Sequence, residues 1–205
     1  MVPRDELEHG SGASRVARFL PSLLAGGALL GLLAYGVLRP GPAAEIEPGA
    51  PAPGFELPRV TAAGDLEGTL SDDDLEGSVV VLNFWWSGCD PCREEAPLLD
   101  AVWRKHRADG LVVVGVDVER DTPAAAADFA KAFGMSYPIV RDVEGELADA
   151  YRINDRFLPQ TFFIDRDGTI APLAVGKVLT DARGSAYLGA LTRPVLEKQV
   201  AALLD

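Results

Sequence analysis

The sequence predicts an α/β sandwich, in which helices cover a central sheet. Two apolar runs rich in β-branched residues, at 79–86 and 111–118, have the composition of strands buried on both faces. A third strong strand is expected at 160–165. Helical patterns follow the first two runs, at 91–108 and 123–133, so strands alternate with helices along the chain.

Shorter elements are expected around this framework. A hairpin is predicted at the start of the folded part, around Ala63–Asp65. Thr122 and Thr192 are expected to cap helices, because each precedes a proline in a first helical turn. The predicted shorter elements are the hairpin strands 55–60 and 66–70, a short helix or turn at 71–74, an extended segment at 137–140, a short helix at 144–152, a hairpin strand at 169–175 and a last helix from 192. Residues 176–191 give no clear pattern.

The two cysteines of the chain, Cys89 and Cys92, stand at the predicted junction between the strand 79–86 and the helix 91–108. Unpaired N–H groups and the helix dipole favour a thiolate at a helix N-terminus. In such Cys-X-X-Cys settings the thiol pKa falls from about 8.5 to roughly 3.5–7.5. We expect a redox pair in which Cys89 is exposed and attacks a disulfide, while Cys92 lies about one turn inside and resolves the mixed disulfide.

Two other interpretations of this pair are a structural disulfide and half of a zinc site. Zinc requires two further ligands, and the only histidines are His9 and His106, which are far apart in the sequence. The context of the motif therefore favours redox chemistry over both.

The chain carries 19 Lys and Arg against 31 Asp and Glu, a formal net charge of −12. The three Arg and three acidic residues of positions 1–38 cancel, so the whole excess lies in residues 39–205. An acidic surface of this kind disfavours nucleic acid and anionic lipid headgroups as partners.

Residues 19–38 form an uncharged apolar run that is long enough to span a bilayer as a helix. A signal peptide is the alternative, but its apolar region is usually shorter, about 7–15 residues, and ends at a small-residue cleavage site that is not evident here. Arg4, Arg15 and Arg18 precede the run and only Arg39 follows it closely. The positive-inside rule therefore predicts a retained single-pass signal-anchor with a cytoplasmic N-terminus and an extracytoplasmic domain.

The expected organisation has four parts. A polar tail covers residues 1–18 and the anchor residues 19–38. Residues 39–54 contain five prolines and are expected to form a stiff linker. The remaining residues, 55–205, are numerous enough for one domain with a well-buried core.

Two segments resemble a known family. The first reads NFW-x3-CxxC-R-x-E-x-P, from Asn83 to Pro97, and the second is LPQTFFID, from Leu158 to Asp165, followed by Asp167-Gly168. Together they resemble the membrane-anchored thioredoxin-like thiol–disulfide oxidoreductases of the TlpA, ResA and CcmG (DsbE) type, over about residues 51–176. This resemblance implies a thioredoxin-like sandwich with a central mixed sheet, an N-terminal β-hairpin extension and a preceding transmembrane helix.

The resemblance also implies the roles of individual residues. Cys89 corresponds to the nucleophile and Cys92 to the resolving thiol of a redox disulfide. Glu95 corresponds to an acidic residue that takes and returns a proton as Cys92 ionises. Pro159 corresponds to the cis-proline opposite the dithiol. A set of residues is expected to meet the substrate protein: Pro159, Leu158, Trp86 and Pro91.

The sequence departs from the family pattern at three points. The family usually has Trp directly before the first cysteine, where this chain has Gly88 and places Trp86 two residues earlier. Asp90 puts an acid between the cysteines, which should raise the thiol pKa values. Trp85-Trp86 replaces a common Trp-Ala pair, for which core packing and partner recognition are equally good explanations.

The resemblance implies a disulfide reductase that needs no cofactor, with protein disulfides as substrates, apocytochrome c awaiting haem among them, and a membrane thiol protein as electron donor. A monomer is expected. One alternative is a copper-delivery module of the Sco type, which pairs a CxxxC with a distant His, whereas no His follows His106 here. Another is a thiol peroxidase, which would normally have Thr at the position that Trp86 occupies.

Overall fold

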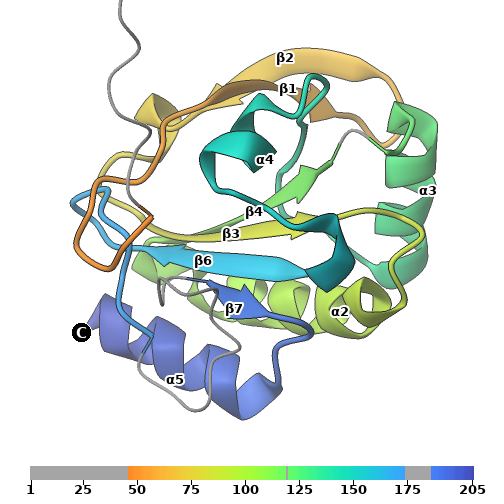
Figure 1. Ribbon diagram of the computed structural model, residues 1–205. Helices are drawn as coiled ribbons and strands as arrows, with labels where there is room; N and C mark the ends of the chain where they lie inside the picture. Colours follow the sequence, from red (N-terminus) through yellow and green to blue (C-terminus); the bar gives the residue numbers. More distant parts are fainter. Residues whose placement is uncertain (1–45, 119, 174–185) are drawn as a thin grey trace, which may run out of the picture. The chain divides into compact units, whose positions relative to one another are not determined.

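Strand β3 (Val79–Trp85) is buried along its whole length and lies within a mixed sheet that has seven strands in the described part of the chain. The structure is a computed structural model that describes residues 46–118, 120–173 and 186–205. The strand order is β2-β1-β5-β4-β3-β6-β7 (Figure 1). The strands other than β3 are β1 (Glu56–Val60), β2 (Leu66–Ser71), β4 (Leu111–Asp117), β5 (Ile139–Arg141), β6 (Gln160–Ile164) and β7 (Tyr187–Leu188).

The pairing of β3 explains its uninterrupted apolar sequence. It pairs in parallel with β4, from Val79↔Leu111 to Trp85↔Asp117, and antiparallel with β6, from Val80↔Ile164 to Phe84↔Gln160. Helices cover both faces of such a central strand, so neither set of its alternating side chains meets water. The C-terminal end of β3 and the start of β6 consequently lie side by side, at the same end of the central strands.

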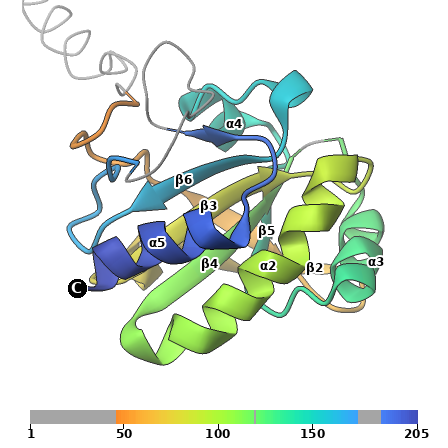
Figure 2. The same cartoon turned by 90° about the horizontal axis from the view of Figure 1, so that it is seen from below.

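Two helices cover one face of the sheet along much of its length, α2 (Asp90–His106) and α5 (Arg193–Leu204), and α3 (Pro123–Phe133) lies beside α2 (Figure 2). Leu99 of α2 and Leu196 of α5 are fully buried in one core cluster with Val79 and Val81. The short helix α4 (Glu146–Ala150) lies on the opposite face (Figure 1). There Tyr151 packs in a second cluster with Phe84 and Phe162.

The predicted α/β architecture is confirmed, including the N-terminal hairpin. Strands β1 and β2 pair antiparallel, and β1 joins the sheet through β5 at Arg59↔Val140. Thr122 caps α3, because its hydroxyl accepts a hydrogen bond from the Ala125 N–H at 3.2 Å. Thr192 is the residue before α5, but its side chain makes no capping hydrogen bond.

One expectation near the start of the domain was wrong, and one near its end was confirmed in part. Ile46, within the predicted linker, is only 1% exposed and belongs to the core. Residues 49–52 bond to the turn after β6, with Ala52 N–H donating to the Gly168 carbonyl and Ile170 N–H to the Ala50 carbonyl. The predicted hairpin after β6 is present in residues 169–171, with the bridge Ile164↔Ile170 and the Ala171 N–H donating to the Phe163 carbonyl, while residues 174–175 lie outside the described residues. Strand β7, in the stretch with no clear sequence pattern, pairs with the start of β6.

The predicted anchor at 19–38, and the tail before it, lie outside the described residues. Within the ranges that the structure does describe, none of the helices combines the length and the hydropathy that a membrane span requires.

Candidate active site

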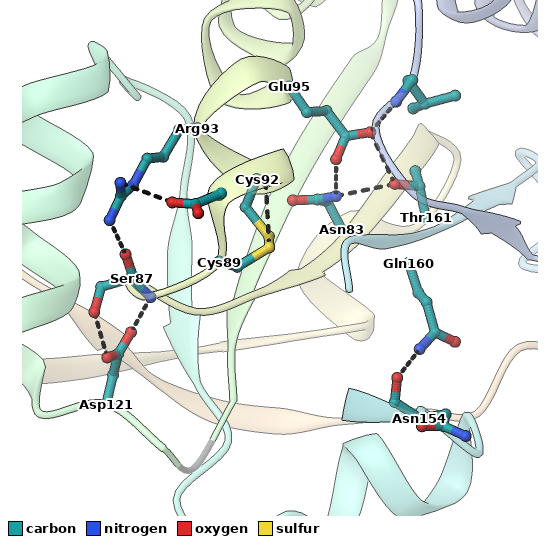
Figure 3. Close-up of a disulfide and its surroundings, with 12 residues drawn as sticks. Asn83, Ser87, Cys89, Cys92, Arg93, Glu95, Asp121, Asn154, Gln160 and Thr161 are labelled. Carbon is teal, nitrogen blue, oxygen red and sulfur yellow. Dashed lines mark hydrogen bonds and ion pairs between the residues drawn. A yellow bond between two sulfur atoms is a disulfide. The ribbon is translucent and has the colours of Figure 1, made fainter. Parts of the chain in front are cut away.

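The dithiol lies where β3 passes into α2. Cys89 is the N-cap residue of α2, with extended backbone, and its Sγ accepts a hydrogen bond from the Cys92 N–H at 3.2 Å (Figure 3). Pro91 suits this first turn, since it has no N–H to leave unpaired. Cys89 and Cys92 form a disulfide, with Cα atoms 5.3 Å apart. The positive end of the helix dipole therefore faces the first sulfur.

Both cysteines are buried in this oxidised state. Cys89 is 6% exposed and Cys92 is 2% exposed. Cys92 is the deeper of the two, as expected, but the expectation of an exposed Cys89 was wrong for the disulfide form. The bond to Cys92 turns the Cys89 Sγ toward the start of the helix rather than toward solvent (Figure 3).

Glu95 lies one turn after Cys92 and is buried, with 1% exposure. Its Oε2 accepts a hydrogen bond from the Asn83 side-chain amide at 3.0 Å. Its Oε1 accepts from the backbone N–H of Leu191 at 3.1 Å and from the Thr161 hydroxyl at 3.4 Å. The Asn83 amide also donates to Thr161 at 2.9 Å, so the carboxyl belongs to a network that joins α2, β3 and β6 (Figure 3).

Burial raises the pKa of Glu95 to about 7, and the hydrogen bonds from Leu191, Asn83 and Thr161 oppose the shift without cancelling it. The group therefore exchanges a proton near neutral pH. Its hydrogen bonds reach Asn83, Thr161 and Leu191, and none of them goes to a cysteine sulfur. The structure thus brings Glu95 beside the dithiol within the first turns of α2, with Asn83 bonded to it.

The loop before Cys89 is held from the end of β4. The Asp121 carboxylate accepts two hydrogen bonds from Ser87, one from the backbone N–H and one from the hydroxyl, each at 2.5 Å (Figure 3). Asp121 is itself 8% exposed, and its carbonyl accepts a hydrogen bond from the Arg141 guanidinium. Arg141 also pairs with Asp117 at 2.5 Å. Burial and the Asp121 carboxylate raise the pKa of Asp117, and Arg141 opposes that shift.

Asp90, the acid between the cysteines, is exposed and pairs with Arg93 at 2.9 Å. The Arg93 guanidinium also approaches the Ser87 carbonyl, at 3.5 Å. Solvent and this cation both screen the Asp90 carboxylate, so its repulsion of a thiolate is weaker than the bare sequence suggests.

Trp86 and Gly88 fit together. A Cβ built on Gly88 would come within 2.3 Å of Trp86 Cη2, so the indole ring occupies the space that a side chain at 88 would need. The Arg120 guanidinium lies over the same ring, 5.5 Å from its centroid. Trp86 is half-buried and forms part of the surface beside the dithiol.

The peptide bond Leu158–Pro159 is cis, as the resemblance implied. The register Phe84↔Gln160 puts Pro159 at the same end of the central strands as the dithiol. The side chains of Leu158 and Pro159 are buried, whereas Pro91 is exposed. Phe157, directly before them, is 54% exposed.

Several residues of the site were not anticipated from the sequence: Ser87, Arg120, Asp121, Phe157, Thr161 and Leu191. Phe157 could have been found from the sequence, because it is an apolar residue directly before the Leu158-Pro159 motif. Asp121 and Leu191 could not have been found in this way, because each meets its partner only through the tertiary fold.

Comparison with known proteins agrees with this geometry. Residues 48–172 match the family described as AhpC/TSA. The thiol-disulfide oxidoreductase ResA of Oceanobacillus iheyensis is 32% identical over 133 residues, which cover 65% of this chain and 67% of that protein. ResA of Bacillus subtilis is 32% identical over 132 residues, covering 64% of this chain and 69% of that protein.

A solved structure is similar as well. The crystal structure of a protein from Chlorobium tepidum, described as a thiol:disulfide interchange protein DsbE, superposes with a TM-score of 0.61 at 28% identity. The match covers 76% of this chain and 96% of that one. The fold, the Cys89–Cys92 pair and these similarities agree, and the chain belongs to the AhpC/TSA family as a thioredoxin-like thiol–disulfide oxidoreductase of the ResA and DsbE type.

Proposed function

We propose that the protein is an extracytoplasmic disulfide reductase, which passes two electrons from the Cys89–Cys92 dithiol to disulfides of partner proteins. The observation that carries this proposal is the position of Cys89 at the N-cap of α2, where its sulfur accepts the Cys92 N–H. That position stabilises a thiolate at Cys89, and the thiolate is the species that attacks a disulfide.

The direction follows from the charges around the dithiol. A stabilised thiolate makes a dithiol more oxidising, because it favours the reduced form. Glu95 and Asp90 act in the opposite sense, because a carboxylate near a thiolate disfavours it and so favours the disulfide. The buried Glu95 therefore supports a protein that gives electrons away, and Asp90, which solvent and Arg93 screen, adds a weaker effect of the same sign.

The reaction runs in two exchanges. The Cys89 thiolate attacks one sulfur of the partner's disulfide, a mixed disulfide forms, and the partner's other sulfur leaves as a thiolate that takes up a proton. Cys92 then loses its proton and attacks the Cys89 Sγ, which breaks the mixed disulfide and releases the partner's second thiol. The Cys89–Cys92 disulfide that results is the state of this structure, and a donor dithiol must reduce it again.

In this scheme Glu95 receives the proton of Cys92 and returns it during the reverse step. Its pKa of about 7 makes both forms of the carboxyl available near neutral pH, as a general base requires. Asn83 fixes the carboxyl through its amide and has no basic group to compete with it.

The proposed location rests on the sequence before the domain. The apolar run 19–38 serves as the anchor, and the excess of arginine before it orients the domain away from the cytoplasm. A reporter that is active only in the cytoplasm, fused after Asp205, is expected to be silent. Activity of that reporter would refute the orientation.

The proposed substrates are proteins that must keep two nearby cysteines reduced outside the cytoplasm. Apocytochrome c awaiting haem is the leading example, with a membrane thiol protein as the electron donor. Expression of full-length Cys92→Ser should strand partners on Cys89 as mixed disulfides, because the resolving thiol is absent. Reductant-sensitive complexes are expected with Cys92→Ser and not with Cys89→Ser/Cys92→Ser. Equal recovery from both variants would refute the reductase mechanism.

The two alternative functions have their own observable signatures. A copper-delivery module would retain copper stoichiometrically on purification; in the described part of the chain, no group of three or more His, Cys, Asp and Glu side chains is arranged to hold a metal. A thiol peroxidase would consume hydroperoxide at Cys89. The Trp86 ring lies over Gly88 beside that cysteine, where the peroxidase pattern has a threonine.

A further inference from the structure

A pocket of about 680 Å³ opens at the same end of the central strands as the dithiol. Three arginines line it, Arg120 from the loop after β4 and Arg152 and Arg156 from the segment between α4 and Pro159. We call it the arginine pocket. Glu144 and Asp149 line it on the side of α4.

The arginine pocket adjoins both segments that flank the dithiol. On one side, the Arg120 guanidinium lies over the Trp86 ring, and that ring covers Gly88 directly before Cys89. On the other side, the carbonyl of Asn154, a residue of the pocket wall, accepts a hydrogen bond from the Gln160 side chain at 2.8 Å. Gln160 follows Pro159, so a chain held at the cysteines can reach the pocket.

The charges of two of the three arginines, Arg152 and Arg156, are available to a ligand. Arg152 and Arg156 are exposed, and neither forms an ion pair with any residue of the described ranges. Glu144 and Asp149 lie beyond ion-pair distance of both guanidinium groups. The whole chain is strongly acidic, with a formal net charge of −12, whereas the three arginines of the pocket outnumber its two acids, Glu144 and Asp149, so the lining carries a small net positive charge.

The backbone at Arg152 ends helix α4 in a left-handed turn at the wall of the pocket. Its φ is 55°, which makes it the one non-glycine residue in the left-handed region among the described residues. A left-handed residue directly after the C-cap is a common way for a helix to end, the Schellman motif, so the end of α4 accounts for this φ. Two hydrogen bonds hold it there, from the Arg152 N–H to the Asp149 carbonyl and from the Ile153 N–H to the Ala148 carbonyl.

We propose that the arginine pocket binds an acidic segment of the protein whose disulfide is reduced at Cys89–Cys92. This proposal rests on the proposed function, because the occupant of the pocket is part of the substrate of the dithiol. Guanidinium groups pair with carboxylates through two parallel hydrogen bonds, and a pocket of this volume accommodates a few side chains. A polypeptide is the favoured occupant over a polyanion such as nucleic acid, which the rest of the acidic surface repels.

The test compares three synthetic peptides that share one disulfide and differ in the residues beside it, acidic, serine or lysine. The full-length protein is reduced beforehand, and the second-order rate constant of peptide reduction is measured at low and high salt. We expect the acidic peptide to react about tenfold faster than the serine peptide at low salt, and the advantage to shrink at high salt.

The matched variants are Arg152→Gln/Arg156→Gln and Arg152→Glu/Arg156→Glu, with Lys198→Glu as the control. Lys198 is an exposed cation of α5, on the opposite face of the sheet from α4. The first variant should abolish the preference for the acidic peptide, the second should reverse it toward the lysine peptide, and the control should change neither. An equal preference in the wild type and both arginine variants would overturn the proposal.

Two further measurements separate this proposal from the proposed function. Reaction of the reduced protein with a small uncharged aromatic disulfide should be the same in all variants, which shows that the dithiol is intact. Binding of cysteine-free peptides to the oxidised protein, followed by fluorescence anisotropy, should favour the acidic peptide only while the arginines are present. Selective binding without peptide reduction would refute the reductase function and leave the pocket assigned, whereas reduction without selective binding would refute the pocket.

Discussion

The Gly88 backbone lies directly beneath the six-membered ring of Trp86, and a Cβ at position 88 would come within 2.3 Å of that ring. Gly88 is therefore required for space at this point of the chain. The two departures from the family pattern, the glycine before Cys89 and the tryptophan two residues earlier, form one packing arrangement. Arg120 extends it from the other side of the indole ring.

The first prediction is that Gly88→Ala destabilises the protein through Trp86. The added methyl displaces the ring, and overpacking of this kind costs about 1 kcal/mol where the displaced side chain is half-buried, as Trp86 is. Denaturant unfolding of the oxidised protein measures the loss. In a Trp86→Ala background the same substitution should cost close to nothing. An equal loss in both backgrounds would show that the ring is not the reason for the glycine.

The second prediction concerns Asp121, which accepts both polar hydrogens of Ser87. Asp121→Asn keeps the shape but offers one acceptor oxygen, so the free energy of unfolding should fall by about 1–3 kcal/mol. Ser87→Ala removes only the hydroxyl bond and should cost less. The reactivity of Cys89 toward a small disulfide should also change its pH dependence in Asp121→Asn, because the loop that positions the thiol is released. A matching stability loss with an unchanged pH profile would limit Asp121 to a structural role.

The sequence predicts the central elements well because their signals are local. The apolar run that becomes β3 and the Thr122-Pro123 start of α3 both carry their own periodicity or capping chemistry. The Cys89–Cys92 pair is equally local, since three residues of spacing at a strand–helix junction define it.

The structure differs from the prediction made from the sequence where segments far apart in the chain pack together. Residues 49–52 bond to the turn at 168–170, and Tyr187 and Leu188 pair with the start of β6 from a stretch whose sequence has no clear pattern. Ile46 is apolar but stands among prolines, and only the fold shows that it enters the core. In the site, the Leu191 N–H that bonds Glu95 lies 96 residues away in the chain. A backbone donor has no residue type, so no sequence pattern can indicate it.

The third prediction is a pH dependence of stability that comes from Glu95. Burial raises its pKa from 4.5 to about 7, so the folded protein binds a proton there that the unfolded chain releases at lower pH. The contribution is fully present below about pH 4.5 and is lost as the pH rises through about 7. The unfolding free energy of the oxidised protein, relative to Glu95→Gln, should therefore fall by about 3 kcal/mol between pH 4 and pH 8. Parallel stability curves for the two proteins would show that the carboxyl titrates normally.

The last prediction is that Glu95 sets the reactivity of the dithiol. It stands three residues after Cys92 on α2, it is buried, and Asn83 is its hydrogen-bonded neighbour and cannot serve as a base. A carboxylate in this position raises the thiol pKa values by like-charge repulsion, and a thiolate raises the pKa of the carboxyl in turn. The groups therefore titrate in macroscopic steps that belong to the set.

Glu95→Gln should lower the apparent thiol pKa of the reduced protein and slow resolution of the mixed disulfide, because the negative charge and the proton acceptor are both removed. The amide keeps the size of the side chain, so the fold should be retained. Alkylation rates measured from pH 4 to pH 10 give the apparent thiol pKa, and decay of a preformed mixed disulfide gives the resolution rate. Glu94→Gln is the control, since Glu94 is exposed on the same helix. Superimposable curves for Glu95→Gln and the wild type would show that Glu95 does not act on the dithiol, while a shift in Glu94→Gln of equal size would show that any charge on α2 suffices.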